Sequence, residues 1–108
     1  MSFKVELTAA AASDLEEIYD YICRHDSPAN AEYVLDRIES VFQSLSEHPQ
    51  RGSYPGELLD IGVREYREVF FKPYRIIYLV AGDTVYVLVI ADGRRDMQTL
   101  LQRRLLQG

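Results

Sequence analysis

The stretch YRIIYLVAGDTVYVLVIA, residues 74–91, decides the fold, because two runs of β-branched and aromatic residues flank the dipeptide Gly82-Asp83. Such runs are typical of strands, and a glycine in the turn tolerates the positive φ of a tight hairpin. We therefore predict strands over residues 74–81 and 84–91. Both runs are apolar on both faces, so the sequence places these strands at the centre of a sheet with a layer on each side.

Two further strands are predicted from the segments on either side of the helices. The sequence VREYREVFF, residues 63–71, has the same aromatic and β-branched texture, and Lys72-Pro73 separates it from the strand that follows. Near the N-terminus, FKVELT, residues 3–8, alternates apolar and polar residues with the period of a half-buried strand.

Two amphipathic helices are predicted between these strands. Thr8 is the expected N-cap of the first, and Ser27 caps the second with Pro28 at the first helical position. We expect the two helices to form an antiparallel hairpin. Their apolar residues recur at helical spacing: Ala11, Leu15, Ile18 and Ile22 in the first, and Ala31, Val34, Leu35, Ile38, Val41, Phe42 and Leu45 in the second. The acidic residues Asp14, Glu16, Glu17 and Asp20 are interpreted as the solvated face of the first helix.

The segment HPQRGSYPGELLDIG, residues 48–62, is predicted to be a loop, because it has two prolines, three glycines and no helical period. Its length makes it a candidate functional loop. Leucines at the C-terminal end favour a short helix that packs on the sheet. The order β-α-α-β-β-β-α predicts an α+β fold, a helical hairpin on a mainly antiparallel sheet, in a single domain over residues 1–108.

Composition and charge restrict the function classes. The chain has 47% hydrophobic and 27% charged residues, as ordinary globular proteins do. We expect a cytoplasmic protein without membrane contact, because the start lacks a signal-peptide pattern and no long uncharged apolar run occurs. Of the net charge of -5, residues 1–63 contribute -8 and residues 64–108 contribute +3. This asymmetry indicates a face for an anionic partner, but the basic excess is smaller than duplex DNA binding usually requires.

The sequence gives no reason to expect a metal or another cofactor. Cys23 is the only cysteine, and the cluster Cys23, His25 and Asp26 at the end of the first helix has no matching ligand pair elsewhere. The same residues are a poor nucleophile and base, since positions two apart on a helix point to different sides.

The candidate binding residues are arginines. Guanidinium groups suit phosphate, because each presents a planar fork of donors, and these positions could converge near one edge of the sheet. The alternative is local pairing with Glu65, Glu68, Asp92 and Asp96. Both interpretations stay open for the five arginines Arg64, Arg67, Arg75, Arg94 and Arg95.

Four stretches together resemble the RelE/ParE superfamily of toxins from type II toxin–antitoxin systems, most closely its ParE or plasmid-stabilisation branch. They are LTAAAASDLEEIYDYI, SPANAEYVLDRIESVFQSLSEHPQRG, REYREVFFKPYRIIYLV and VLVIADGRRDMQTLL, which span nearly the whole chain. The most specific elements are the Ala-x-x-Asp-Leu start of the first helix, the His-Pro-x-x-Gly loop and Tyr-Arg-Ile-Ile-Tyr in the sheet. The predicted order of elements agrees with that fold.

The resemblance implies one of two activities. RelE-like members cleave mRNA on the ribosome with basic residues of the sheet, and Arg67, Arg75 and Arg95 fall at such catalytic positions. Arginine is a poor acid or base, however, and Val69 and Leu101 occupy positions where RelE has a sheet lysine and a C-terminal tyrosine. The acid–base half of that reaction is missing.

ParE-like members instead inhibit DNA gyrase, which requires a binding surface and no catalytic residue. The acidic sequence fits that branch better, so we expect a non-enzymatic toxin in which the five arginines contact the target or the antitoxin. The resemblance also implies a cognate antitoxin that folds on the toxin. A ribonuclease acting on the ribosome with mRNA is the alternative, and an inactive antitoxin-binding relative is a third interpretation. The oligomeric state stays open.

Overall fold

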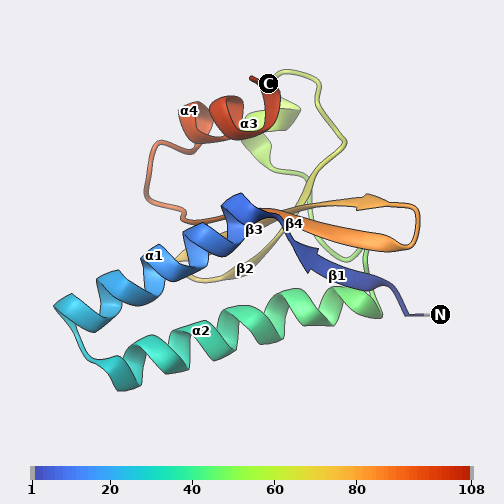
Figure 1. Ribbon diagram of the computed structural model, residues 1–108. Helices are drawn as coiled ribbons and strands as arrows, with labels where there is room; N and C mark the ends of the chain where they lie inside the picture. The colour runs from blue at the N-terminus through green and yellow to red at the C-terminus, as the bar shows by residue number, and fades with distance from the viewer. Residues whose placement is uncertain (1, 108) are drawn as a thin grey trace.

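The structure is a computed structural model that describes residues 2–107. A helical hairpin lies on one side of the sheet, and short helices near the C-terminus lie on the other (Figure 1). The order of elements confirms the predicted α+β fold. The elements are β1 (Lys4–Leu7), α1 (Ala9–His25), α2 (Pro28–Gln43), η1 (Ser44–Ser46), α3 (Gly56–Leu59), β2 (Arg67–Phe71), β3 (Tyr74–Ala81), β4 (Thr84–Asp92), α4 (Met97–Leu101) and η2 (Gln102–Leu106).

The four strands form one sheet in the order β1-β4-β3-β2. Strands β2, β3 and β4 pair antiparallel, whereas β1 pairs parallel with β4. The two strands of residues 74–91 are therefore central, as predicted. Gly82 in their turn has a φ of 61°, which glycine adopts without steric cost. A bulge between Ile77 and Tyr78 shifts the pairing of β3 with β4.

The predicted caps begin the two long helices. The Thr8 hydroxyl accepts a hydrogen bond from the Ala11 N–H at 3.1 Å, and the Ser27 hydroxyl accepts one from the Asn30 N–H at 3.0 Å. Each bond satisfies one N–H that has no partner within its helix. Pro28 follows Ser27 at the start of α2, where the missing N–H costs nothing.

Apolar clusters cover both faces of the sheet. Tyr78 and Ile76 of β3 pack with the α1–α2 hairpin, and Ile77 between them packs with α3 and α4. This alternation follows from the period of two in a strand. The first cluster is built around Ala11, Ile38, Phe42, Leu45, Val69, Ile76, Tyr78, Val85, Val87 and Ile90, and the second around Leu58, Ile77, Val89, Ala91, Met97, Leu100 and Leu101.

Three boundaries differ from the prediction. Strand β2 begins at Arg67, so residues 63–66 are not strand, because the Val63 N–H turns back to the Leu58 carbonyl oxygen at 2.9 Å. The predicted loop contains the single-turn helix α3, which Leu58 anchors in the second apolar cluster. The C-terminal helix changes from α to π geometry at Gln102. Within residues 2–107, no helix has the length and apolar character needed to cross a membrane.

Candidate functional site

Arg67 holds the loop of residues 48–54 against the sheet. Its Nη1 donates to the Gly52 carbonyl oxygen at 2.9 Å, and its Nη2 donates to the Tyr54 hydroxyl at 3.2 Å. The guanidinium carbon also lies 4.6 Å from the centre of the Tyr54 ring, within the range of a cation–π contact. Arg67 is paired across the strands with Tyr78, so it lies on the face of the sheet that carries the helical hairpin.

Tyr78 fastens the same loop from inside the core. Its hydroxyl donates to the Pro49 carbonyl oxygen at 2.7 Å and accepts from the Gly52 N–H at 3.0 Å. A Cβ at position 52 would lie 2.6 Å from both the Tyr78 hydroxyl and the Glu68 carbonyl oxygen, so only glycine fits. Burial raises the pKa of the Tyr78 phenol above its usual value. The His-Pro-x-x-Gly and Tyr-Arg-Ile-Ile-Tyr stretches are therefore two halves of one contact.

Arg75 is enclosed by two carboxylates on the opposite face of the sheet. Its Nε donates to Glu68 at 2.7 Å, while Nη1 and Nη2 donate to the two oxygens of Glu57 at 2.8 and 2.7 Å. Only 14% of the Arg75 side chain is exposed. Each of the three guanidinium nitrogens already donates to a carboxylate, so a phosphate could take a bidentate position on Arg75 only by displacing one of them.

The two carboxylates titrate in opposite directions. The hydrogen bonds from Arg75 lower the pKa of Glu57. Burial, as the dominant cause, raises the pKa of Glu68 despite its bond to the same guanidinium. The difference follows from depth, because Glu68 lies within the sheet and Glu57 lies on α3 nearer the solvent. The hydrogen bond to Glu57 is the main cause that raises the pKa of Arg75.

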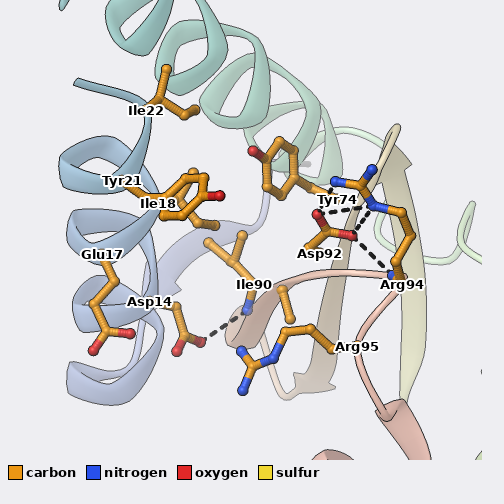
Figure 2. A pocket seen from close by; sticks show the side chains of 11 residues that line it. Asp14, Glu17, Ile18, Tyr21, Ile22, Tyr74, Ile90, Asp92, Arg94 and Arg95 are labelled. Atoms are coloured by element: carbon orange, nitrogen blue, oxygen red, sulfur yellow. Dashed lines mark hydrogen bonds and ion pairs between the residues drawn. The ribbon is translucent and has the colours of Figure 1, made fainter. Parts of the chain in front are cut away.

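Arg94 and Arg95 follow β4 and line an open groove. Arg94 donates to both carboxylate oxygens of Asp92, with the Nη2 contact at 2.6 Å, yet 80% of its side chain is exposed. The bond lowers the pKa of the Asp92 carboxyl. Arg95 is exposed and extends its guanidinium toward α1 (Figure 2).

The groove beside these arginines has a volume of about 460 Å³ between α1 and the end of β4. Tyr21 of α1 borders it across from Arg94, whereas Tyr74 of β3 lies beside Asp92 and Arg94 (Figure 2). Ile18 and Ile90 also line it. Burial is the main cause that raises the pKa of Tyr74. The groove thus combines apolar area, two phenol rings, two guanidinium groups and the carboxylates of Asp14, Glu17 and Asp92. This composition suits a polypeptide segment or another mixed surface.

The sequence left open a convergence of the five arginines at one edge, and the structure places them at separate sites. Arg64 lies in the irregular segment between α3 and β2 and lines a small hollow with Arg67 and Tyr54. Arg94 and Arg95 line the groove described above, and Arg75 is enclosed. Local pairing is confirmed for Glu68 and Asp92, whereas Asp96 caps α4 by accepting from the Thr99 N–H at 3.2 Å. Between residues 2 and 107, Glu65 makes no ion pair with these arginines.

Sequence reasoning missed one ion pair near the groove. Arg104 donates to both oxygens of Asp14 at 3.0 and 2.9 Å and to the Leu88 carbonyl oxygen at 2.8 Å. Asp14 also accepts from the Ile90 N–H at 3.0 Å. Since β1 ends opposite Val87, these side chains satisfy the edge of β4 that has no neighbouring strand.

Asp14 therefore does not belong to the solvated face to which the sequence assigned it. Its side chain is 14% exposed, because it lies where α1 crosses β4. The Ala-x-x-Asp-Leu stretch was the available signal, since its aspartate stands next to the apolar stripe of the helix.

Comparisons with known sequences agree with this architecture. The model of the family described as the ParE toxin of the type II toxin–antitoxin system parDE matches residues 5–97. Toxin ParE3 of Caulobacter vibrioides is 31% identical over 101 residues, covering 94% of this chain and 97% of the relative. Toxin RelE2 of the same organism is 35% identical over 92 residues, covering 85% of this chain and 97% of the relative.

Solved structures share the fold at lower sequence identity. The chromosomal ParDE system of P. aeruginosa matches with a TM-score of 0.70 at 22% identity, covering 84% of this chain and 96% of the other. A mutant of E. coli toxin RelE in the free state matches with a TM-score of 0.65 at 12% identity, covering 97% of this chain and all of the other. With the family match over most of its length, this chain belongs to the ParE toxins of type II toxin–antitoxin systems.

Proposed function

We propose that this ParE-like toxin inhibits DNA gyrase by binding it, with no catalytic group of its own, and that a cognate antitoxin neutralises it. The observation that carries the proposal is the enclosure of Arg75 by Glu57 and Glu68. Three of the five N–H donors of this guanidinium are held by the two carboxylates, which also compensate its charge, so a phosphate would have to displace a carboxylate to bind it in bidentate form. We place the toxin in the cytoplasm, where gyrase acts.

The remaining residues of the alternative catalytic set support the same proposal. RNA cleavage requires activation of the 2′-hydroxyl, stabilisation of the phosphate and protonation of the leaving oxygen around one atom. Arg67 and Arg75 lie on opposite faces of the sheet and cannot hold the same phosphate. Val69 and Leu101, at positions where RelE has its lysine and tyrosine, are 3% and 0% exposed within the apolar clusters.

The surface proposed for target or antitoxin contact is the groove lined by Arg94 and Arg95. Both arginines are exposed, and Tyr21 and Tyr74 in the same groove add rigid contact area. Arg64 and Arg67 supply a second, smaller basic area at the other end of β2. An antitoxin partner is supported by two relatives of the same fold, the P. aeruginosa ParDE system and the M. tuberculosis toxin–antitoxin complex RelBE2.

The test is induced expression without antitoxin in growing bacteria, with the DNA-damage response and mRNA integrity recorded in the same culture. We expect DNA damage with intact mRNA. Purified gyrase incubated with the toxin should then accumulate cleaved DNA, and gyrase alone should not.

A ribosome-dependent ribonuclease is the second candidate, favoured by the identity of 35% with a toxin named RelE2. It predicts cleaved mRNA without DNA damage in the same experiment. Growth without either signal would support the third interpretation, an inactive relative that binds an antitoxin.

A further inference from the structure

A second groove runs along the outside of the helical hairpin, between α1 and α2. Its volume is about 630 Å³, larger than that of the groove beside Arg94. Apolar side chains contributed by β1 and both helices form its floor. They are Leu7, Ala12, Leu15 and Leu35.

The floor is not covered by the rest of the chain. Ala12 is exposed, and Leu7, Leu15 and Leu35 are only half buried, whereas Ile38 one turn further along α2 is fully buried. Leu35 thus belongs to the groove and not to the deep core that the sequence predicted for it. Half-buried leucines side by side are an apolar surface that a partner can cover.

Every charged side chain on the rim of this groove is a carboxylate. Among residues 2–107, none of those that line the groove is basic. Within residues 2–107, none of the four rim carboxylates forms a hydrogen bond or an ion pair, in contrast to Asp14, Glu57, Glu68 and Asp92. The four are Glu16 and Asp20 of α1 and Glu32 and Glu39 of α2, and all are exposed.

The shape and charge of the groove fit one kind of occupant. From Ala12 to Asp20 the groove follows α1 for about 12 Å, two helical turns at about 1.5 Å per residue. An amphipathic helix of that length can place apolar residues at i, i+3 or i+4 and i+7 on the floor. Basic residues beside them would meet carboxylates on both sides, and nucleic acid or an anionic membrane surface would be repelled.

We propose that the α1–α2 groove binds a basic amphipathic helix of a partner protein, separately from the arginine groove on the other side of α1. The apolar floor supplies the contact area, and Glu16, Asp20, Glu32 and Glu39 select lysine- or arginine-flanked sequences. This binding surface lies outside the residues assigned to the target and antitoxin above. It therefore stands whether or not gyrase is the target.

The experiment uses a fluorescein-labelled helical peptide with leucines at i, i+4 and i+7 flanked by lysines, and measures anisotropy against the full chain. A peptide of the same composition in scrambled order is the first control. We expect saturable binding of the amphipathic peptide and at least about tenfold weaker binding of the scrambled one, since the same charges without an apolar stripe cannot use the floor.

Two variants test whether the peptide binds in the α1–α2 groove. Glu32→Lys with Glu39→Lys reverses the rim on α2, and Ala12→Tyr fills the floor without changing charge. All three positions are exposed on helices, so folding is expected to persist and is checked by circular dichroism. Each variant should weaken peptide binding by about tenfold or more.

The matched control is Asp60→Lys with Glu65→Lys, which changes net charge equally at exposed positions between α3 and β2. It should keep the affinity of the wild type within about twofold at the same ionic strength. Equal loss in this control, or full binding by Ala12→Tyr, would refute the groove and leave only general charge attraction. Concentration-dependent self-association that the Glu32→Lys, Glu39→Lys variant abolishes would also overturn the proposal, because the occupant would be a second copy of the chain.

Discussion

Arg75 and Arg94 are both arginines near one end of the sheet, but their surroundings differ. Arg75 is 14% exposed and bridges Glu57 on α3 to Glu68 on β2. The Arg94 side chain is 80% exposed and, within residues 2–107, bonds only to Asp92, two residues before it. The first joins distant elements, and the second joins neighbours in one turn.

The difference shows when an arginine is available to a partner. Removing the partner of a buried charge leaves that charge without compensation, whereas an exposed pair exchanges its bonds with water at little cost. Arg75 is therefore expected to stabilise the fold, and Arg94 to serve binding. Five changes test this division, from the largest expected effect to the smallest.

Arg75→Ala should produce the largest loss of stability. It leaves Glu57 and the 5% exposed Glu68 without their cation, for an expected loss of about 3–5 kcal/mol in the free energy of unfolding. Urea denaturation measures it. The control combines Arg75→Met with Glu57→Gln and Glu68→Met, which removes all three charges and should recover most of the loss. Wild-type stability in Arg75→Ala would contradict the enclosure.

Arg104→Ala tests an intermediate case. Its side chain is 22% exposed, and its guanidinium bonds to Asp14 and to the Leu88 carbonyl oxygen at the uncovered edge of β4. We expect a loss of about 2 kcal/mol in the free energy of unfolding, within the range for hydrogen bonds to charged groups. The neighbouring Arg103 is exposed, and Arg103→Ala is the matched control with no expected loss. Equal effects of the two changes would show that the pair with Asp14 does not stabilise the fold.

Glu57→Gln should have a smaller effect that depends on pH. The folded pKa of Glu57 is lowered by Arg75, so its contribution is present above the ordinary pKa of about 4.3 and is lost as pH falls through the lower folded value. The stability difference from the wild type should be about 1 kcal/mol at pH 7 and shrink toward pH 3. Urea denaturation across this range measures it, and a difference that grows on acidification would reverse the assigned sign.

Glu68 contributes with the opposite sign in the same titration. Burial raises the pKa of Glu68 in the folded protein, so protonation of this carboxyl favours the folded state. The stability that Glu68 contributes is therefore present below its ordinary pKa and is lost as the pH rises through the folded pKa. The difference in unfolding free energy between the wild type and Glu68→Gln should therefore change with pH in the opposite direction to the difference for Glu57→Gln.

Arg94→Ala with Arg95→Ala should leave the melting temperature unchanged, because both side chains are exposed. Growth arrest or antitoxin affinity should fall, by about tenfold or more if the two guanidinium groups contact the partner. Arg24→Ala with Arg103→Ala removes the same charge elsewhere and should keep both properties. A double variant that fails to fold would instead assign Arg94 and Arg95 a structural role.

The fold could be predicted from sequence where its causes are local. Thr8, Ser27 and Pro28 act on N–H groups within three residues, and Gly82 relieves strain in its own turn. The predictions for α3 and the start of β2 were wrong because tertiary burial of Leu58 stabilises a turn that its own sequence does not favour.

The candidate site depended on contacts that no local pattern contains. Glu57 is 18 residues from Arg75, and Asp14 is 90 residues from Arg104. Whether a guanidinium is enclosed or free follows from the register of β2 against β3 and from the position of α3. A shift by one residue would move Arg67 and Arg75 to the other faces.

By itself, the sequence determined the order of the elements, the helix caps, the central hairpin of residues 74–91 and the resemblance to a toxin family, because hydrophobic period and backbone preference act over a few residues. Only the tertiary structure decided that Arg75 is enclosed, that Arg94 and Arg95 are exposed at a groove, and that Asp14 completes the edge of β4. The physical reason is that the energy of a charge depends on its solvation and its neighbours, and both are set by segments far apart in the chain.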